Sequence, residues 1–248
     1  MNKIFKKIMQ YIFQIFFRKK VAIRDSWIVT PKKQRNMLEF LCWFDRTKSV
    51  VESISSGQVD WEHRFKRFKH FNSVTKGIAL EIGFGGGRLL AHAAKDFDKV
   101  IGVDIHQNFA MSKKFLALNN ITNYQLIKRS EMSGISPNSI DYVYSFIVFQ
   151  HFDSFKEVKF YLDHIHRILT NDGVAHIYFG KNNSDGVEVT KDGKFYLRDC
   201  SLFINIKTMK SLIEENFKII SIKDKVVKDP VKNIGESVQS MIIFKRLD

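Results

Sequence analysis

Four glycines stand where an apolar run gives way to a helical pattern, and they mark the stretch of the chain that could bind a ligand. Residues 78–82 predict a buried strand that contains Glu81, and the helical pattern starts at Arg88. The intervening glycines are Gly83, Gly85, Gly86 and Gly87. Glycine adopts backbone conformations that a Cβ forbids, and it lets a ligand approach bare backbone at a helix N-terminus. The stretch therefore predicts a ligand-binding loop between a strand and a helix.

A second apolar run, residues 99–103, ends in the acidic residue Asp104. A βαβ unit places a carboxylate against ribose hydroxyls about 20 positions after its glycine loop, and Asp104 lies 23 positions after Glu81. A dinucleotide fingerprint would require glycine at position 88, where the chain has Arg88. The pattern predicts a cofactor that contains a ribose and disfavours a nicotinamide dinucleotide.

The spacing of these residues resembles motifs I and II of the class I methyltransferases that depend on S-adenosyl-L-methionine (SAM). The resemblance covers the chain from Gly77 to the C-terminus and implies an α/β, Rossmann-like fold. That fold has a seven-stranded, mostly parallel sheet and a closing antiparallel β-hairpin, which we expect from residues 217–222 and 240–245. The resemblance also implies SAM as cofactor, bound by Glu81, Gly83, Gly85, Gly87, Asp104, Ile105 and, after the predicted strand 124–128, Ser130 and Glu131 beside the adenine.

The run at residues 140–152 is the second strong signal. It resembles the fourth-strand motif of the same family, in which an Asp opens a buried strand, and in open α/β sheets ligands bind outside the carboxyl ends of the strands. Phe146 should therefore face the cofactor, and Gln150 the methyl acceptor. His151 is the candidate general base, since the ordinary pKa of histidine suits deprotonation of a hydroxyl or amine near neutrality. A packing role for His151 remains the alternative. Beyond this strand we expect a helix over 155–169, a turn at 170–173, and a substrate lid in 180–201.

The first 25 residues form a basic, amphipathic segment. Residues 1–35 carry ten Lys or Arg against one acid, which is +9 of the total formal charge of +14. Polar residues fall on one helical stripe of residues 3–20, and Ile and Phe cover the rest. The run is too short to span a membrane and lacks a signal-peptide cleavage site. A helix on an anionic membrane surface and a helix packed on the protein or in a dimer are both compatible with it.

Residues 26–76 predict a helical cap before a catalytic domain at 77–248. Between Trp61 and Phe71, aromatic residues alternate with bases. Such a pattern could stack nucleobases, but we expect a helix whose Trp61, Phe65 and Phe68 face the core. N-terminal helices often close the substrate pocket in the family that the chain resembles, which makes His63 and Arg64 candidates for substrate binding.

Composition limits the remaining functional classes. The chain has 248 residues, 44% of them hydrophobic and 27% charged, as in an ordinary globular protein. Its two cysteines, Cys42 and Cys200, lie far apart and suggest neither a disulfide framework nor a metal site. We expect a cytoplasmic enzyme, with residues 1–20 as a peripheral contact to the inner face of the membrane. The sequence does not determine an oligomeric state.

The sequence favours SAM-dependent O-methylation of a small molecule, a sugar or a lipid-linked glycan near the membrane. The chain lacks an Asn-Pro-Pro-Tyr-type motif for methylating amino groups, and most of its excess positive charge lies at the N-terminus, so nucleic acid is disfavoured as substrate. Three alternatives stay open: an RNA methyltransferase, a nicotinamide-dependent oxidoreductase, and a SAM-binding interaction module without catalysis.

Overall fold

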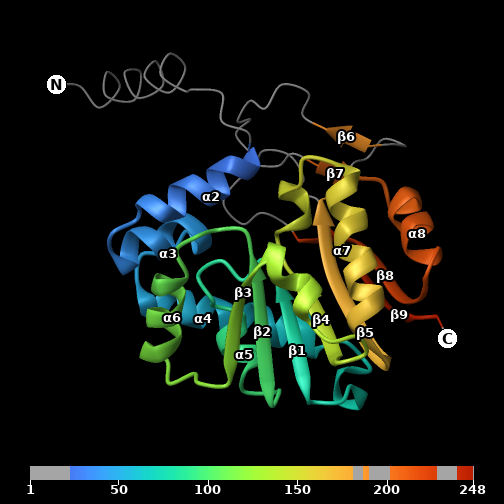
Figure 1. The fold of residues 1–248 in the computed structure, drawn as a ribbon, viewed down its shortest axis with the longest axis horizontal. Helices are drawn as coiled ribbons and strands as arrows, with labels where there is room; N and C mark the ends of the chain where they lie inside the picture. The colour runs from blue at the N-terminus through green and yellow to red at the C-terminus, as the bar shows by residue number, and fades with distance from the viewer. Residues whose placement is uncertain (1–22, 181–186, 190–201, 228–238, 248) are drawn as a thin grey trace.

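The structure is a computed structural model that describes residues 23–180, 187–189, 202–227 and 239–247. Seven strands form one sheet in the order β3-β2-β1-β4-β5-β9-β8 (Figure 1). Strands β1 to β5 run parallel, and β9 lies antiparallel between β5 and β8. The bounds are β1 Ile78–Ile82, β2 Lys99–Asp104, β3 Tyr124–Lys128, β4 Ile140–Ser145, β5 Leu169–Gly180, β8 Phe217–Val227 and β9 Gln239–Arg246. The predicted Rossmann-like sheet and its closing hairpin are confirmed.

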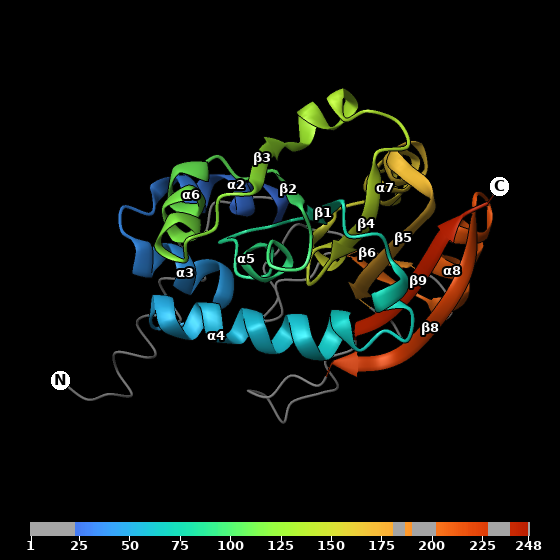
Figure 2. The ribbon, with the colours of Figure 1, turned by 90° about the horizontal axis from the view of Figure 1, so that it is seen from below.

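Helices cover both faces of the sheet, and α4 and α7 lie on opposite sides of it (Figure 2). Alternate strand residues point to two separate apolar cores, as expected for a sheet buried on both faces. One core contains α7 and α8, and the other contains α3, α5, α6 and a π-helix, η1. The helix bounds are α2 Ile23–Lys33, α3 Met37–Asp45, α4 Val50–Asp60, η1 Trp61–Lys66, α5 Leu90–Ala93, α6 Phe109–Leu118, α7 Phe155–Ile168 and α8 Ile206–Glu214.

The N-terminal helices begin where polar caps satisfy free backbone N–H groups. Ser49 caps α4, because its hydroxyl accepts a hydrogen bond from the Glu52 N–H at 3.0 Å. In return, the Glu52 carboxylate accepts from the Lys48 N–H at 2.7 Å. Helix α4 then continues directly into η1, whose Trp61 and Phe65 are fully buried and whose neighbour Phe68 packs against the same core. The prediction that these aromatic rings face the core is therefore confirmed.

Strand order decides where a ligand can bind. β1 pairs with β2 on one side and with β4 on the other. Strands β2 and β3 therefore extend the sheet on one side of β1, and β4 and β5 extend it on the other, which makes the gap between β1 and β4 the switch point of the topology. At such a switch point the loops after the two strands diverge and leave a crevice at their carboxyl ends. The glycine loop follows β1, and residues 146–151 follow β4.

Two local predictions differ from the structure. The turn expected at 170–173 is wrong, because β5 starts at Leu169 and runs through these residues, with a register shift against β4. The expected lid over 180–201 contains a strand, β6 Val187–Val189, which pairs with β7 Leu202–Ile204 in a separate two-stranded sheet. The rest of that segment lies outside the described residues.

The basic segment 1–20 also lies outside the described residues, so its membrane-surface and packing interpretations stay predictions. In the part of the chain that the structure does describe, no helix is long and apolar enough to span a bilayer.

Candidate active site

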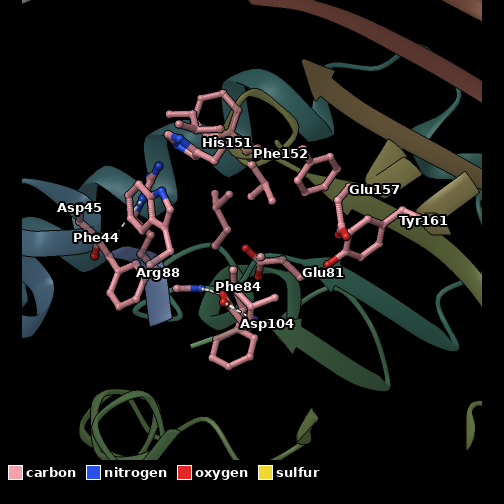
Figure 3. A pocket seen from close by; sticks show the side chains of 18 residues that line it. Phe44, Asp45, Glu81, Phe84, Arg88, Asp104, His151, Phe152, Glu157 and Tyr161 are labelled. Carbon is pink, nitrogen blue, oxygen red and sulfur yellow. Dashed lines mark hydrogen bonds and ion pairs between the residues drawn. The ribbon is translucent and has the colours of Figure 1, made fainter. Parts of the chain in front are cut away.

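A cavity opens at the switch point, between the carboxyl ends of the central strands and the N-terminal helices (Figure 3). Strands β1 and β2 contribute Glu81 and Asp104, and the segment after β4 contributes Phe146 and His151. In Figure 3, Glu81 and Asp104 lie across the cavity from His151 and Phe152. The side walls come from Phe44 and Asp45 of α3 and from Glu157 and Tyr161 of α7. Elements far apart in sequence thus converge on one site.

The glycine loop takes a backbone path that favours glycine. Gly83, Gly85 and Gly87 have φ of 77°, 49° and 97°, in the left-handed region where a Cβ is strained. The Gly87 N–H donates to the Phe84 carbonyl at 2.8 Å and closes a tight turn. Gly83 and Gly85 line the cavity, whereas Gly87 packs toward Leu116 beneath it. The loop therefore brings bare backbone to the cavity, as its sequence predicts.

Asp104 ties the loop to the end of β2. One carboxylate oxygen accepts from the Gly85 N–H at 2.8 Å, and the other accepts from the N–H groups of Ile105 at 2.7 Å and His106 at 3.1 Å. An ionised carboxylate has about four lone-pair sites, so three backbone donors leave capacity for one more. The buried Asp104 side chain lines the cavity and is placed to accept a hydrogen bond from a ligand hydroxyl.

Glu81 is a buried acid at the end of β1 that also lines the cavity. Burial raises the pKa of its carboxyl to about 8, although the hydroxyl of Tyr144, which donates to it at 3.0 Å, and the charge of Arg88 lower this pKa. The negative charges of Asp104 and Asp45 raise the pKa further. Near neutrality the group is therefore largely protonated until a positive charge enters the cavity.

We expect Glu81→Gln to remove part of the pH dependence of the free energy of unfolding measured without ligand. Between the ordinary pKa of 4.5 and about 8, the folded protein keeps a Glu81 proton that the unfolded chain releases. Stability is therefore lost as pH rises through this window, with a slope of up to about 1.4 kcal/mol per pH unit from this group. Urea unfolding at a series of pH values measures the slope.

Glu131→Gln is the matched control, because Glu131 is exposed and lies in the short helix η3, Arg129–Gly134, outside the cavity. It should keep the wild-type slope. A wild-type slope in Glu81→Gln would instead mean that Glu81 is already ionised in the folded protein.

The N-terminal cap closes the cavity with aromatic rings. Trp27 of α2 lies 4.6 Å from the His151 ring and 6.0 Å from Phe44, measured between ring centroids. The indole Nε1 of Trp27 is buried and has no hydrogen-bond partner among the described residues. The ring of Trp27 therefore forms part of the cavity wall.

Two arginines and two acids join the cap to the glycine loop. Arg88, the first residue after the glycines, contacts Asp45 of α3 at 3.4 Å and Asp60 of α4 at 2.6 Å. Asp60 also pairs with Arg64 at 2.6 Å, and the guanidinium of Arg64 lies 4.8 Å from the centroid of the Phe146 ring. Gly57 permits this approach, because a Cβ there would lie 2.9 Å from the Arg88 carbonyl carbon and closer still to its oxygen.

The predicted site residues divide between the cavity and its surroundings. Glu81, Gly83, Gly85, Asp104, Ile105, Phe146 and His151 line the cavity. The cavity lining does not include Gly87, Ser130, Glu131, Gln150, His63 or Arg64.

Each residue outside the lining has an evident structural setting. The Glu131 carboxylate accepts from the Lys128 N–H at 2.7 Å, beside the exposed Ser130. The side chain of Gln150 is buried against Gln239, whose amide donates to it. His63 is exposed on η1, and Arg64 is linked to the site through the Phe146 ring and through Asp60, which it shares with Arg88. Direct binding roles for these residues stay predictions.

Sequence reasoning missed the contributions of the cap and of α7. Trp27, Phe44 and Asp45 line the cavity but belong to helices whose sequence shows only ordinary apolar periodicity. Glu157 and Tyr161 are four residues apart on α7, and this spacing on one helix face was the available signal. Arg129 holds Glu157 at 2.9 Å.

Comparison with known families relates this part of the chain to one kind of domain. Residues 80–175, which include the glycine loop, Asp104 and the segment after β4, match the sequence model of a methyltransferase domain. Over this stretch the chain is similar to methyltransferase domains. No curated protein matches the sequence.

Solved structures share the fold of this chain at low sequence identity. A SAM-dependent methyltransferase from Leishmania major superposes with a TM-score of 0.61 at 16% identity, covering 95% of this chain and 90% of that one. The 1,6-didemethyltoxoflavin-N1-methyltransferase of Burkholderia thailandensis, solved with its substrate and S-adenosylhomocysteine, gives 0.58 at 14% identity and covers 80% and 85%. A SAM-dependent methyltransferase from Clostridium acetobutylicum gives 0.56 at 12% identity and covers 84% and 96%.

The residues of the cavity suit SAM, which carries a positive sulfonium and a positive ammonium group. Among the described residues, four acids line the cavity, namely Asp45, Glu81, Asp104 and Glu157, and Arg88 is the one arginine in the lining. Bare glycine backbone and aromatic rings complete the lining. Among the described residues, no group of acids, histidines and cysteines is placed to hold a metal ion.

Proposed function

We propose that this protein is a SAM-dependent methyltransferase that methylates a hydroxyl group of a small molecule, a sugar or a lipid-linked glycan, with His151 as the general base. The observation that supports this most is the position of His151. It lines the same cavity as Glu81 and Asp104 but lies on the wall opposite them (Figure 3). A base across the cavity from the cofactor-binding residues leaves space for an acceptor between the two.

SAM supplies an electrophilic methyl group, so the protein has to align the acceptor, remove its proton and exclude water. Glu81 and Asp104 would bind the cofactor through its ammonium group and its ribose. The imidazole of His151 would take the proton of the acceptor hydroxyl as the methyl group is transferred. Trp27 and Phe44 would exclude water from that side.

A compact acceptor fits the enclosure by the cap better than RNA does. Trp61 and Phe65, the aromatic residues that could have stacked nucleobases, are buried in the core under the sheet. The setting near a membrane rests on the basic, amphipathic sequence of residues 1–20 alone.

We expect His151→Asn to lower methyl transfer by about 100-fold or more and to leave the affinity for S-adenosylhomocysteine unchanged. The loss follows because asparagine cannot take up the acceptor proton at neutral pH. The assay measures transfer of labelled methyl groups from SAM to separate pools of cellular small molecules, lipids and RNA, with binding followed by calorimetry.

His164→Asn provides the matched control, because His164 lies on α7 outside the cavity lining and bonds only the Phe160 carbonyl in the described hydrogen-bond network. It should retain full transfer. Full transfer by His151→Asn would contradict a base role for this residue, and label in the RNA pool alone would replace the proposed acceptor class with RNA.

A further inference from the structure

The N-terminal cap places a carboxylate against the glycine loop. Asp45 is the last residue of α3 and lies before residues 80–175, the segment that matches the family model. Its side chain is only 5% exposed, and it lines the cavity next to Phe44 and Arg88 (Figure 3). A methyl group built on Gly86 would lie 3.3 Å from Oδ2 of Asp45, so the carboxylate directly abuts the loop.

Two contacts fix this carboxylate in place. The hydroxyl of Ser53 on α4 donates a hydrogen bond to Asp45, and Nε of Arg88 lies 3.4 Å from the other carboxylate oxygen. Asp60 shares the same guanidinium at 2.6 Å but does not line the cavity. Two carboxylates therefore share the positive charge of Arg88, so this charge compensates the negative charge of Asp45 only in part.

The wall of the cavity around the glycine loop consequently has an excess of acids. Asp45, Glu81 and Asp104 all lie there, and Arg88 is the only arginine or lysine in the lining among residues that the structure describes. Burial raises the pKa of Asp45, and the charge of Asp45 helps to raise the pKa of Glu81. A positively charged ligand would relieve this repulsion, whereas a ligand without that charge would relieve less of it.

SAM and its product S-adenosylhomocysteine differ by one methyl group and by the positive charge on sulfur. We propose that Asp45 is a selectivity residue of the cofactor site, whose carboxylate makes the site prefer the charged methyl donor over the product with neutral sulfur. The preference helps product to leave after transfer, because the reaction removes the charge that Asp45 attracts. This inference rests on SAM dependence and is independent of the proposed acceptor and of the role of His151.

Calorimetric titration of the full chain with SAM, S-adenosylhomocysteine and sinefungin tests the proposal. Sinefungin carries an amino group at the position of the transferred methyl and is positively charged there. We expect Asp45→Asn to lower the preference for SAM over S-adenosylhomocysteine by about tenfold, the scale of one charge at a few ångströms in a partly screened site. Sinefungin should follow SAM, and the affinity for S-adenosylhomocysteine should change little.

Asp60→Asn is the matched control. It removes a carboxylate from the same guanidinium but not from the cavity lining, so it should change the preference by less than about twofold. An equal change in Asp60→Asn would show that the effect passes through Arg88 alone and would overturn the proposal. Equal weakening of SAM and S-adenosylhomocysteine by Asp45→Asn would also overturn it, because Asp45 would then only hold the cap in place.

A variant with the opposite effect on local charge keeps the proposal testable if thermal melting shows that Asp45→Asn does not fold. Arg88→Gln removes the positive charge beside Asp45 and should raise the preference for SAM severalfold. An unchanged or lowered preference in folded Arg88→Gln would contradict a charge-based selection.

Discussion

Replacement of Asp104 by alanine should weaken binding of S-adenosylhomocysteine by well over tenfold, which exceeds about 1.4 kcal/mol. The substitution removes the acceptor that we propose for the ribose hydroxyls. It also leaves the N–H groups of Gly85, Ile105 and His106 without their present partner at the cavity wall. Loss of these bonds loosens the glycine loop. The lost ribose contact and the loosened loop therefore both lower the affinity for S-adenosylhomocysteine. Isothermal titration calorimetry at fixed pH measures the affinity.

Asp141→Ala separates ligand binding from general stability. Asp141 also accepts a backbone hydrogen bond at a strand end, from the Ile78 N–H at 2.8 Å, but it does not line the cavity. This control should lower the melting temperature and leave the affinity within about twofold. If Asp104→Ala folds and binds S-adenosylhomocysteine as tightly as wild type, Asp104 does not hold the ribose.

Replacement of Gly83 by alanine should destabilise the protein by about 2–5 kcal/mol and abolish measurable cofactor binding. Gly83 has a φ of 77°, where a Cβ is strained, and this Cβ would lie 2.8 Å from one methyl carbon of Val148 and closer still to the other. The loop after β4 would have to move away from the glycine loop, and the two loops together form the cavity. Urea unfolding gives the stability, and calorimetry gives the binding.

Gly134→Ala is the control for glycine replacement, since no atom lies within 4 Å of the position that a Cβ would take there. Its stability should stay within about 1 kcal/mol of wild type. Adding Val148→Ala to Gly83→Ala removes the clashing methyl groups and should recover part of the stability but not the cost of the backbone strain. Wild-type stability and binding in Gly83→Ala would contradict the tight contact between the two loops.

The fold was largely predictable because its signals are local. A glycine loop after an apolar strand, an acid at the end of the next strand, and alternating helical and strand patterns each depend on neighbours in sequence. The predicted strand at 124–128 has the bounds of β3, and the predicted first strand has those of β1. The turn expected at 170–173 failed because pairing of β5 with β4 and β9 extends the strand over residues with a local preference for a turn.

The position of several predicted residues at the cavity was predictable for the same reason. Glu81, Gly83, Gly85, Asp104 and Ile105 lie at the ends of β1 and β2 or in the loops that directly follow them, and all of them line the cavity. Parallel strands bring their carboxyl ends to one edge of the sheet, so the position along each strand is enough to place these residues. To place Ser130, Glu131 and Gln150 one must also know where their side chains point, which the position along the chain does not give. Their side chains lie outside the cavity lining.

The sequence by itself determined the sheet, the glycine loop and Asp104, because backbone conformation and strand periodicity are set by residues close in the chain. Only the tertiary structure decided which cap residues reach the cavity. Trp27 and Asp45 come from helices whose own patterns say only that one face is buried. Asp45 is placed where α3 and α4 pack on the glycine loop through Arg88, and Trp27 is placed by ring contacts with Phe44 and His151. Contacts between distant segments leave no periodic pattern in the sequence.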